Sequence, residues 1–253
     1  MNRILKSACI VNRENGEIMD KSIQRLLEEP DTEILVVDNN SQDNTKELLK
    51  KYDNNPKVKY WIWDIKGASY NRNWMVKHSQ GKYILLLDSD VLYESGSFDY
   101  LIKRLETAPK IDNYSFGVVG FTFFSFTNIM GEQARHLPPD DSPFLYVYEP
   151  CVPCQYGVFL RELFFEHNIW FDENFGVGWG CEDDDFGVQM FQKGFLCATI
   201  EFKYYHNKNT EQYRELHHPD FTKFQERLQY YKQKWDTSVL NQIEGFYKKL
   251  RGE

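Results

Sequence analysis

The sequence predicts an α/β fold with a mainly parallel sheet that is covered by helices on both faces. Apolar runs of strand length alternate with segments whose apolar residues recur at helical spacing, as in sheets built from strand-helix-strand units. The strand-like runs are nearly unbroken in hydrophobicity, which is typical of strands buried on both faces. A length of 253 residues fits one such domain with a modest extension.

The amino-terminal part supplies the clearest elements. Four strands are predicted, at Leu5–Val11, Ile34–Val37, Val58–Ile62 and Tyr83–Leu87. Helices are predicted at Ile18–Leu27, from an N-cap at Ser41 to about Tyr52, and at Ala68–His78. In sheets of this kind ligands lie at the carboxyl ends of the strands, and two of these strands run into an aspartate, Asp38 and Asp88.

Beyond Asp90 the alternation of strand-like and helix-like segments is less regular. Phe116–Phe126 predicts a long aromatic strand. The segment Gly131–Pro143 is polar and rich in Pro and Asp, so we expect a loop there that could cover a site and exclude water.

The end of the chain predicts an amphipathic helix that is broken and capped again near Asp236. Its apolar residues recur at nearly 3.5-residue spacing: Phe221, Phe224, Leu228, Tyr231, Trp235, Leu240, Ile243, Tyr247 and Leu250. This stripe either packs back onto the domain or docks another subunit or a partner enzyme. We expect at most peripheral contact with a membrane, because the local excess of basic residues is small.

Composition argues against several functions. The formal charge of −8, without a basic stripe, argues against a nucleic-acid binder. No apolar run approaches the roughly 20 residues that span a bilayer, and Met1–Ile10 does not resemble a signal peptide. Among the five cysteines, Cys151 and Cys154 form a CxxC without the second pair that zinc would need. We expect a cytoplasmic protein.

The segment Asp88-Ser89-Asp90 directly follows the fourth strand. Two carboxylates one residue apart at a strand end can face the same crevice, and hard divalent cations prefer oxygen ligands. A bound Mn²⁺ or Mg²⁺ would neutralise the charge that develops on a departing diphosphate. The position after a buried strand makes this acidic pair more informative than an acidic turn elsewhere.

A second acidic group ends the segment Gly178–Asp185, which reads GWGCEDDD. The glycines let the backbone approach a ligand, and Trp179 offers a ring face on which a sugar can stack. A carboxylate of this group could act as a general base toward an attacking hydroxyl. The alternative is an acidic helix start that is stabilised by the helix dipole.

Two isolated residues give weaker signals. His206 follows an apolar stretch, and such a histidine is either a metal ligand or a structural residue. Asp38 either contacts a ligand or forms a turn.

Together these segments resemble the inverting nucleotide-sugar glycosyltransferases with the GT-A fold, especially family 2. Glu33–Thr45 looks like that family's EIIVVDDGSTDNT segment, and Gly81–Asp90 resembles its GKYILFLDAD. Arg72-Asn73 resembles the Arg-Asn pair on the preceding helix. The block Gly178–Asp185 is similar to the GWGGEDDD of the β-1,4-galactosyltransferases, and the motifs follow the family order over roughly residues 4–210.

The resemblance implies a single displacement in which a hexose or N-acetylhexosamine passes from a nucleotide-diphosphate sugar, most commonly a UDP-sugar, to a hydroxyl of a glycan or glycoprotein. The implied nucleotide site contains Asn12, Asp38, Arg72 and Asp88. The implied metal ligands are Asp90 and His206, with Mn²⁺ or Mg²⁺ as the cofactor. Asp183 would be the catalytic base, and Trp179 and Glu182 would orient the donor and acceptor sugars.

The resemblance also suggests how the chain is divided. We expect one glycosyltransferase domain over residues 1–215, with a nucleotide-binding half at 1–93 and an acceptor and catalytic half at 94–215. Residues 216–253 would form a helical extension. Two departures are visible: the usual Pro-Thr-Tyr-Asn is Cys9–Asn12 here, and Asn39 replaces the second aspartate of the VVDD pair.

Two other functions use related scaffolds. A sugar-phosphate nucleotidyltransferase needs a glycine-rich phosphate loop after the first strand, and Asn12–Gly16 contains one glycine. A noncatalytic saccharide-binding module would be expected to lack Asp90 or Asp183, and both are present. Donor turnover with and without EDTA separates these functions.

Overall fold

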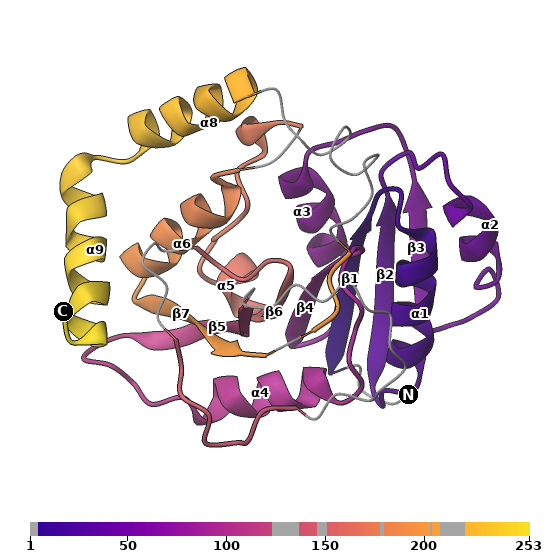
Figure 1. The fold of residues 1–253 in the computed structure, drawn as a ribbon, viewed down its shortest axis with the longest axis horizontal. Coiled ribbons are helices and arrows are strands. Elements are labelled where there is room, and N and C mark those ends of the chain that lie inside the picture. Colours follow the sequence, from indigo (N-terminus) through magenta and orange to yellow (C-terminus); the bar gives the residue numbers. More distant parts are fainter. Residues whose placement is uncertain (1–4, 123–136, 146–150, 178–179, 203, 208–220) are drawn as a thin grey trace.

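The computed structural model describes residues 5–122, 137–145, 151–177, 180–202, 204–207 and 221–253 (Figure 1). Over these residues the strands form one seven-stranded sheet in the order β3-β2-β1-β4-β6-β5-β7. The strands are β1 (Lys6–Asn12), β2 (Thr32–Asp38), β3 (Val58–Ile62), β4 (Tyr83–Asp88), β5 (Ser115–Thr122), β6 (Tyr156–Leu160) and β7 (Phe195–Glu201).

The helices before β5 are α1 (Gly16–Leu27), α2 (Thr45–Lys50), α3 (Ala68–His78) and α4 (Ser97–Thr107). Those after it are α5 (Glu162–Phe165), the short 3₁₀ helix η1 (Glu173–Phe175), α6 (Glu182–Gln192), α8 (Phe221–Lys234) and α9 (Thr237–Arg251). In Figure 1, α1 and α2 lie at one end of the molecule and α8 and α9 at the other.

The directions of the strands determine which residues lie side by side at the strand ends. β1 pairs in parallel with both β2 and β4, so that Asn12 lies beside Asp38 and Val11 beside Asp88. β6 is antiparallel to its neighbours β4 and β5, and β7 is parallel to β5. The carboxyl ends of β1, β2 and β4 therefore meet the amino end of β6 at one edge of the sheet.

Apolar side chains cover both faces of this sheet. One core cluster joins the strands to α1, α2, α4 and α9, through residues such as Ile23, Leu49, Leu101 and Tyr247. The other joins them to α3, α5 and α6, through residues such as Val76, Phe164 and Phe186. The predicted α/β fold, with a mainly parallel sheet between helices, is confirmed.

Most predicted element boundaries lie within a few residues of the observed ones, but the helix after β2 differs. Ser41 does not cap it, because α2 begins at Thr45 and its N-cap position is Asn44. The Ser41 hydroxyl instead donates to Asp38 Oδ1 and accepts the Glu14 N–H. The prediction was wrong because Ser41 stabilises the loop that precedes the helix.

The carboxyl-terminal segment has the predicted break. Asp236 caps α9 by accepting a hydrogen bond from the Ser238 N–H. The apolar stripe is used within the chain: Ile243 and Tyr247 are 1% and 2% exposed, and Tyr231 and Trp235 pack against the same core cluster. The stripe is therefore not available as a whole to a partner. No helix in the described part of the chain is long and apolar enough to span a bilayer.

The predicted covering loop is described from residue 137 onward, and residues 131–136 lie outside the described part. Its described portion packs on α4, where Pro139 accepts a hydrogen bond from Tyr100 and Asp140 pairs with Lys103. Its role in excluding water remains a prediction.

Candidate active site

Asn12 and Asp38 form a buried unit at the ends of β1 and β2. The Asn12 amide donates to Asp38 Oδ1 at 3.0 Å, and also to Ser41 and Thr45. Both side chains are fully buried, and Asp38 Oδ2 accepts the Ser41 N–H. The contacts of Asp38 are thus with the protein, and they fix the loop between β2 and α2 beside the strand ends.

Arg72, on α3, connects the two acidic groups that are far apart in the sequence. Its guanidinium lies 3.4 Å from Asp88 Oδ1, 3.5 Å from Glu182 Oε1 and 3.2 Å from Asp183 Oδ1. The arginine is 5% exposed and lies over the Phe171 ring. One buried cation therefore holds the end of β4 against the start of α6.

The acidic start of α6 follows a backbone that only a few residues tolerate. Gly180 has φ +118° and Cys181 has φ 68°, so the chain turns sharply into the helix. Glu182 is 6% exposed and accepts the Gly180 N–H at 3.0 Å, which closes this turn. Asp183, whose side chain is 27% exposed, is left facing Arg72 and the strand ends. Trp179 lies outside the described residues.

Burial changes the acidity of both carboxylates beside Arg72. Burial, together with the neighbouring charge of Glu182, raises the pKa of Asp183 to about 8, although Arg72 opposes the shift. Burial likewise raises the pKa of Asp88 to about 6, against the opposing effect of Arg72. Carboxyl groups with pKa values near neutrality are suited to proton transfer, and such groups concentrate at functional sites.

Asp90 and His206 are brought together although they are 116 residues apart. His206 Nε2 lies 2.9 Å from Asp90 Oδ2, and both side chains are buried. The backbone holds the pair: Val91 and His206 form a β-bridge, and the Asn207 N–H donates to the Asp90 carbonyl. The two residues are therefore in contact, and their role as metal ligands stays a prediction.

The donor atoms of this pair fit a divalent cation that completes its coordination with ligand oxygens. One carboxylate and one imidazole supply two ligands, and Asp88 lies at the same strand end. Within the described residues no group of three or more His, Cys, Asp or Glu side chains is arranged to hold a metal by itself. Phosphate oxygens and water would have to provide the remaining positions.

The CxxC motif lies under the acidic start of α6, because antiparallel β6 begins at this edge. The Cys154 thiol donates a hydrogen bond to Asp183, and the Cys151 thiol donates to the Val152 carbonyl oxygen. Burial raises the pKa of both thiols well above the usual value, so they stay protonated. All five cysteines are free. The sequence pattern did not predict that Cys154 would contact the acidic group.

Asp185 has a different environment from Asp183. It is fully buried and faces the end of α8, where Lys234 and the next residue, Trp235, contact it. The sequence analysis treated the run of acids as one group and did not predict either contact. The helical spacing was the available signal, since residues two apart on a helix point about 200° apart.

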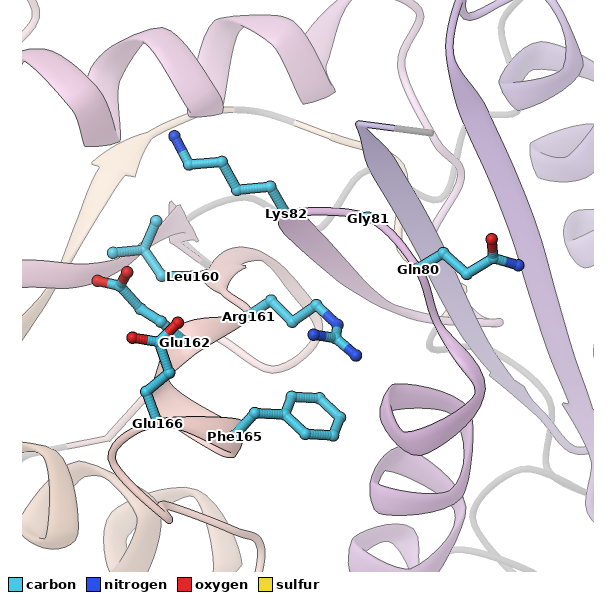
Figure 2. Close-up of a pocket in the computed structure, with 8 residues that line it drawn as sticks. All are labelled: Gln80, Gly81, Lys82, Leu160, Arg161, Glu162, Phe165 and Glu166. Carbon is cyan, nitrogen blue, oxygen red and sulfur yellow. The ribbon is translucent and has the colours of Figure 1, made fainter. Parts of the chain in front are cut away.

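The cavity in Figure 2 is not part of this site. It has a volume of about 340 Å³ and is lined by residues that precede β4 and follow β6, among them Lys82, Arg161 and Phe165. These residues lie at the end of β4 opposite to Asp88. None of the predicted site residues lines this cavity.

Comparisons with known proteins agree with the fold. The chain resembles S. aureus TarS in complex with UDP-GlcNAc, with a TM-score of 0.57 and 18% identity over 81% of this chain and 59% of that one. It also resembles the mannosyltransferase PcManGT from Pyrobaculum calidifontis in complex with GDP-Man and Mn²⁺, with a TM-score of 0.56 and 14% identity over 83% of this chain and 59% of that one.

A sequence relative is the poly-beta-1,6-N-acetyl-D-glucosamine synthase of Staphylococcus epidermidis, which is 27% identical over 86 residues. That segment is 34% of this chain and 21% of the synthase, so the chain matches only part of its relative. Residues 7–164, more than half of the chain, match the sequence model of glycosyl transferase family 2. They run from β1 to α5 and include Asp38, Arg72, Asp88 and Asp90. The chain belongs to glycosyl transferase family 2.

Proposed function

We propose that the protein is a divalent-cation-dependent, inverting glycosyltransferase that transfers a hexose or N-acetylhexosamine from a UDP-sugar to a hydroxyl of a glycan or glycoprotein. The observation that carries this proposal is the bridge through Arg72, which holds Asp88 and Asp183 on either side of one guanidinium. The Asp90–His206 pair lies at the same strand end. A cation site, a proton acceptor and a nucleotide-binding sheet edge therefore converge.

The donor would be held at the carboxyl ends of the strands. The Asn12–Asp38 unit shapes the nucleoside side of this edge, and Arg72 supplies a fixed positive charge near the phosphates. Asp90 and His206 are the residues that would hold Mn²⁺ or Mg²⁺. The cation would neutralise the charge that develops on the leaving diphosphate.

Asp183 is the proposed general base. Its carboxylate is partly exposed at the crevice, and its pKa near 8 makes it a stronger base than an ordinary aspartate. It would take the proton of the acceptor hydroxyl while that oxygen attacks the anomeric carbon from the face opposite the diphosphate. The likeness of Gly178–Asp185 to the β-1,4-galactosyltransferases supports this role, with Trp179 and Glu182 orienting the sugars.

The relatives suggest which donor to test. TarS was solved with UDP-GlcNAc, and the Staphylococcus epidermidis relative is named for a polymer of N-acetyl-D-glucosamine. UDP-GlcNAc is accordingly our first candidate. We also propose the cytosol as the compartment, since the five cysteines form no disulfide.

The test is a calorimetric titration of the full chain with UDP-GlcNAc in the presence of MnCl₂, repeated with EDTA. We expect binding that depends on the cation, and release of UDP over time. Asp90→Ala should abolish the cation-dependent part of the affinity, because it removes a charged oxygen ligand. Asp53→Ala, at an exposed position after α2, is the matched control. Binding without UDP release would favour a noncatalytic saccharide-binding module.

A further inference from the structure

Helix α8 contacts the segment that leads into the acidic start of α6. This segment runs from Asp172 to Asp185, and residues 178–179 within it lie outside the described part. Residues of α8 contact both the segment that precedes α6 and the first turn of α6.

Lys234 is the central contact. Its ammonium lies 2.7 Å from Asp172 Oδ2 and 2.7 Å from Asp185 Oδ1, so one cation joins the two ends of the segment. Asp185 is fully buried, and a buried carboxylate is costly unless it is paired and hydrogen-bonded. The Trp235 indole N–H supplies a second donor to Asp185 at 2.8 Å.

Three further residues of α8 contact the segment between Asp172 and Gly180. The Arg227 guanidinium donates to the carbonyl oxygens of Phe175 and Val177. The Tyr230 hydroxyl donates to Asp172 Oδ2 at 2.8 Å. The Phe224 ring lies against Gly180, so closely that a Cβ at Gly180 would come within 2.8 Å of it.

The contacts with Lys234 act on the pKa of both aspartates. Burial opposes the charge on Asp172, but hydrogen bonds from Lys234, the Asn174 N–H and Tyr230 together lower its pKa. Burial keeps the pKa of Asp185 raised even though Lys234, Trp235 and Gln189 all donate to it. Removal of Lys234 would therefore leave two carboxylates in a buried position without their shared cation.

We propose that α8 positions the acidic start of α6, which would face the acceptor. Lys234 holds Asp183 in place through its ion pairs with Asp172 and Asp185. Asp183 lies two residues before Asp185 on the same helical turn, so a shift of one moves the other. The proposed donor side is built from β1, β2 and β4, and the ion pairs of Lys234 are with Asp172 and Asp185. Lys234 is a positioning residue and touches no substrate. The effect on transfer rests on the proposed function of Asp183.

The first experiment compares Lys234→Met with wild type by hydrogen-deuterium exchange of the full chain. We expect faster exchange at amides between Asp172 and the first turn of α6, and unchanged exchange in β1 and β4. Lys232→Met is the matched control, because it lies on the same helix and is exposed. Equal exchange in Lys234→Met and wild type would overturn the proposal.

The second experiment separates donor binding from transfer. With UDP-GlcNAc and MnCl₂, Lys234→Met should keep the donor affinity of wild type while UDP release falls by about tenfold to a hundredfold, as expected for a misplaced catalytic group. Lys234→Arg should restore part of the rate. A loss of donor affinity with an unchanged turnover number would contradict the assignment to the acceptor side.

Trp235→Phe provides a milder variant in case Lys234→Met unfolds. It removes the indole N–H that contacts Asp185 and keeps a smaller aromatic ring against the core. It should show the same exchange pattern with a smaller loss of rate, and wild-type exchange in this variant would also count against the proposal. If wild type neither binds nor hydrolyses UDP-GlcNAc, the proposed donor is wrong, and the exchange comparison still decides the role of α8.

Discussion

The first turn of α6 places two aspartates in two different surroundings. Asp183 faces the strand ends, is partly exposed, and shares Arg72 with Asp88 and Glu182. Asp185 faces the end of α8, is fully buried, and accepts from Trp235, from Gln189 and from Lys234, which also pairs with Asp172. Asp183 therefore shares one cation with two other carboxylates, whereas Asp185 has three donors.

This difference suggests a role in proton transfer for Asp183 and a structural role for Asp185. A carboxylate that competes for one arginine and carries a raised pKa is able to exchange a proton, at a cost to stability. A carboxylate with several donors of its own holds one element against another. Substitutions that affect one of the two aspartates and spare the other test this distinction.

The largest expected effect is on transfer. Asp183→Asn should reduce the rate by about a hundredfold to ten-thousandfold, the usual contribution of a general base, and leave donor affinity close to wild type. Asp185→Asn keeps a similar shape and should lose less rate but more stability. Rates at saturating UDP-GlcNAc, with calorimetric affinities for both variants, check this. Equal rate losses in both variants would remove the distinction.

The next effect concerns Arg72. Arg72→Met should lower the free energy of unfolding by about 3 kcal/mol at pH 7.5, because carboxylates around a buried cation lose their partner. Arg25→Met, which breaks the more exposed pair with Glu94, should cost at most about 1 kcal/mol. Urea unfolding at pH 7.5 and pH 5 measures both. The loss for Arg72→Met should shrink at pH 5, where Asp88, with a pKa of about 6, is protonated in addition to Asp183.

A smaller effect appears in the pH dependence of stability. The pKa of Asp183 is raised to about 8 in the folded protein, from an ordinary value of 3.8, so the folded state binds the proton more tightly. Its contribution to stability is therefore present below pH 3.8 and is lost as the pH rises toward 8. Asp183→Asn should melt above wild type at pH 8 and near wild type at pH 4. A lower melting temperature at both values would indicate that the residue is structural.

The smallest effect is expected at Cys154. Its thiol donates to Asp183 and lowers the pKa of that carboxyl. Cys154→Ala should therefore shift the alkaline rise of the pH-rate profile to slightly higher pH, whereas Cys154→Ser should stay nearer to wild type because it keeps a donor. An unchanged profile in Cys154→Ala would show that this hydrogen bond does not tune the base.

The nucleotide-binding side was largely predictable from the sequence. Strands with unbroken apolar character and an aspartate at the end specify both a parallel sheet and the edge where Asp38 and Asp88 lie. The pairing of Asp90 with His206 followed from the family resemblance. The spacing of apolar residues along the chain cannot predict this contact, because it does not show which distant segments pack together.

The acceptor side was predictable only in part. The acidic run was found, but its division between Asp183 and Asp185 depends on where α3 and α8 approach α6. The place of the CxxC motif depends on the antiparallel direction of β6, which brings Cys154 to the edge of the sheet where Asp88 lies. Ser41 was misplaced as a cap because its hydroxyl has partners on β1 and β2 that the local sequence does not reveal.

The β-bridge between Val91 and His206 has a consequence for the order of folding. β1 to β4 can form from contacts within the first 90 residues, whereas the Asp90–His206 contact closes a loop of 116 residues. Long loops lose more entropy on closure, and non-local contacts form late in folding. An amino-terminal fragment could therefore form β1 to β4 and still lack the proposed cation site. In the complete chain, the ability to hold a cation should appear later than the secondary structure of β1 to β4.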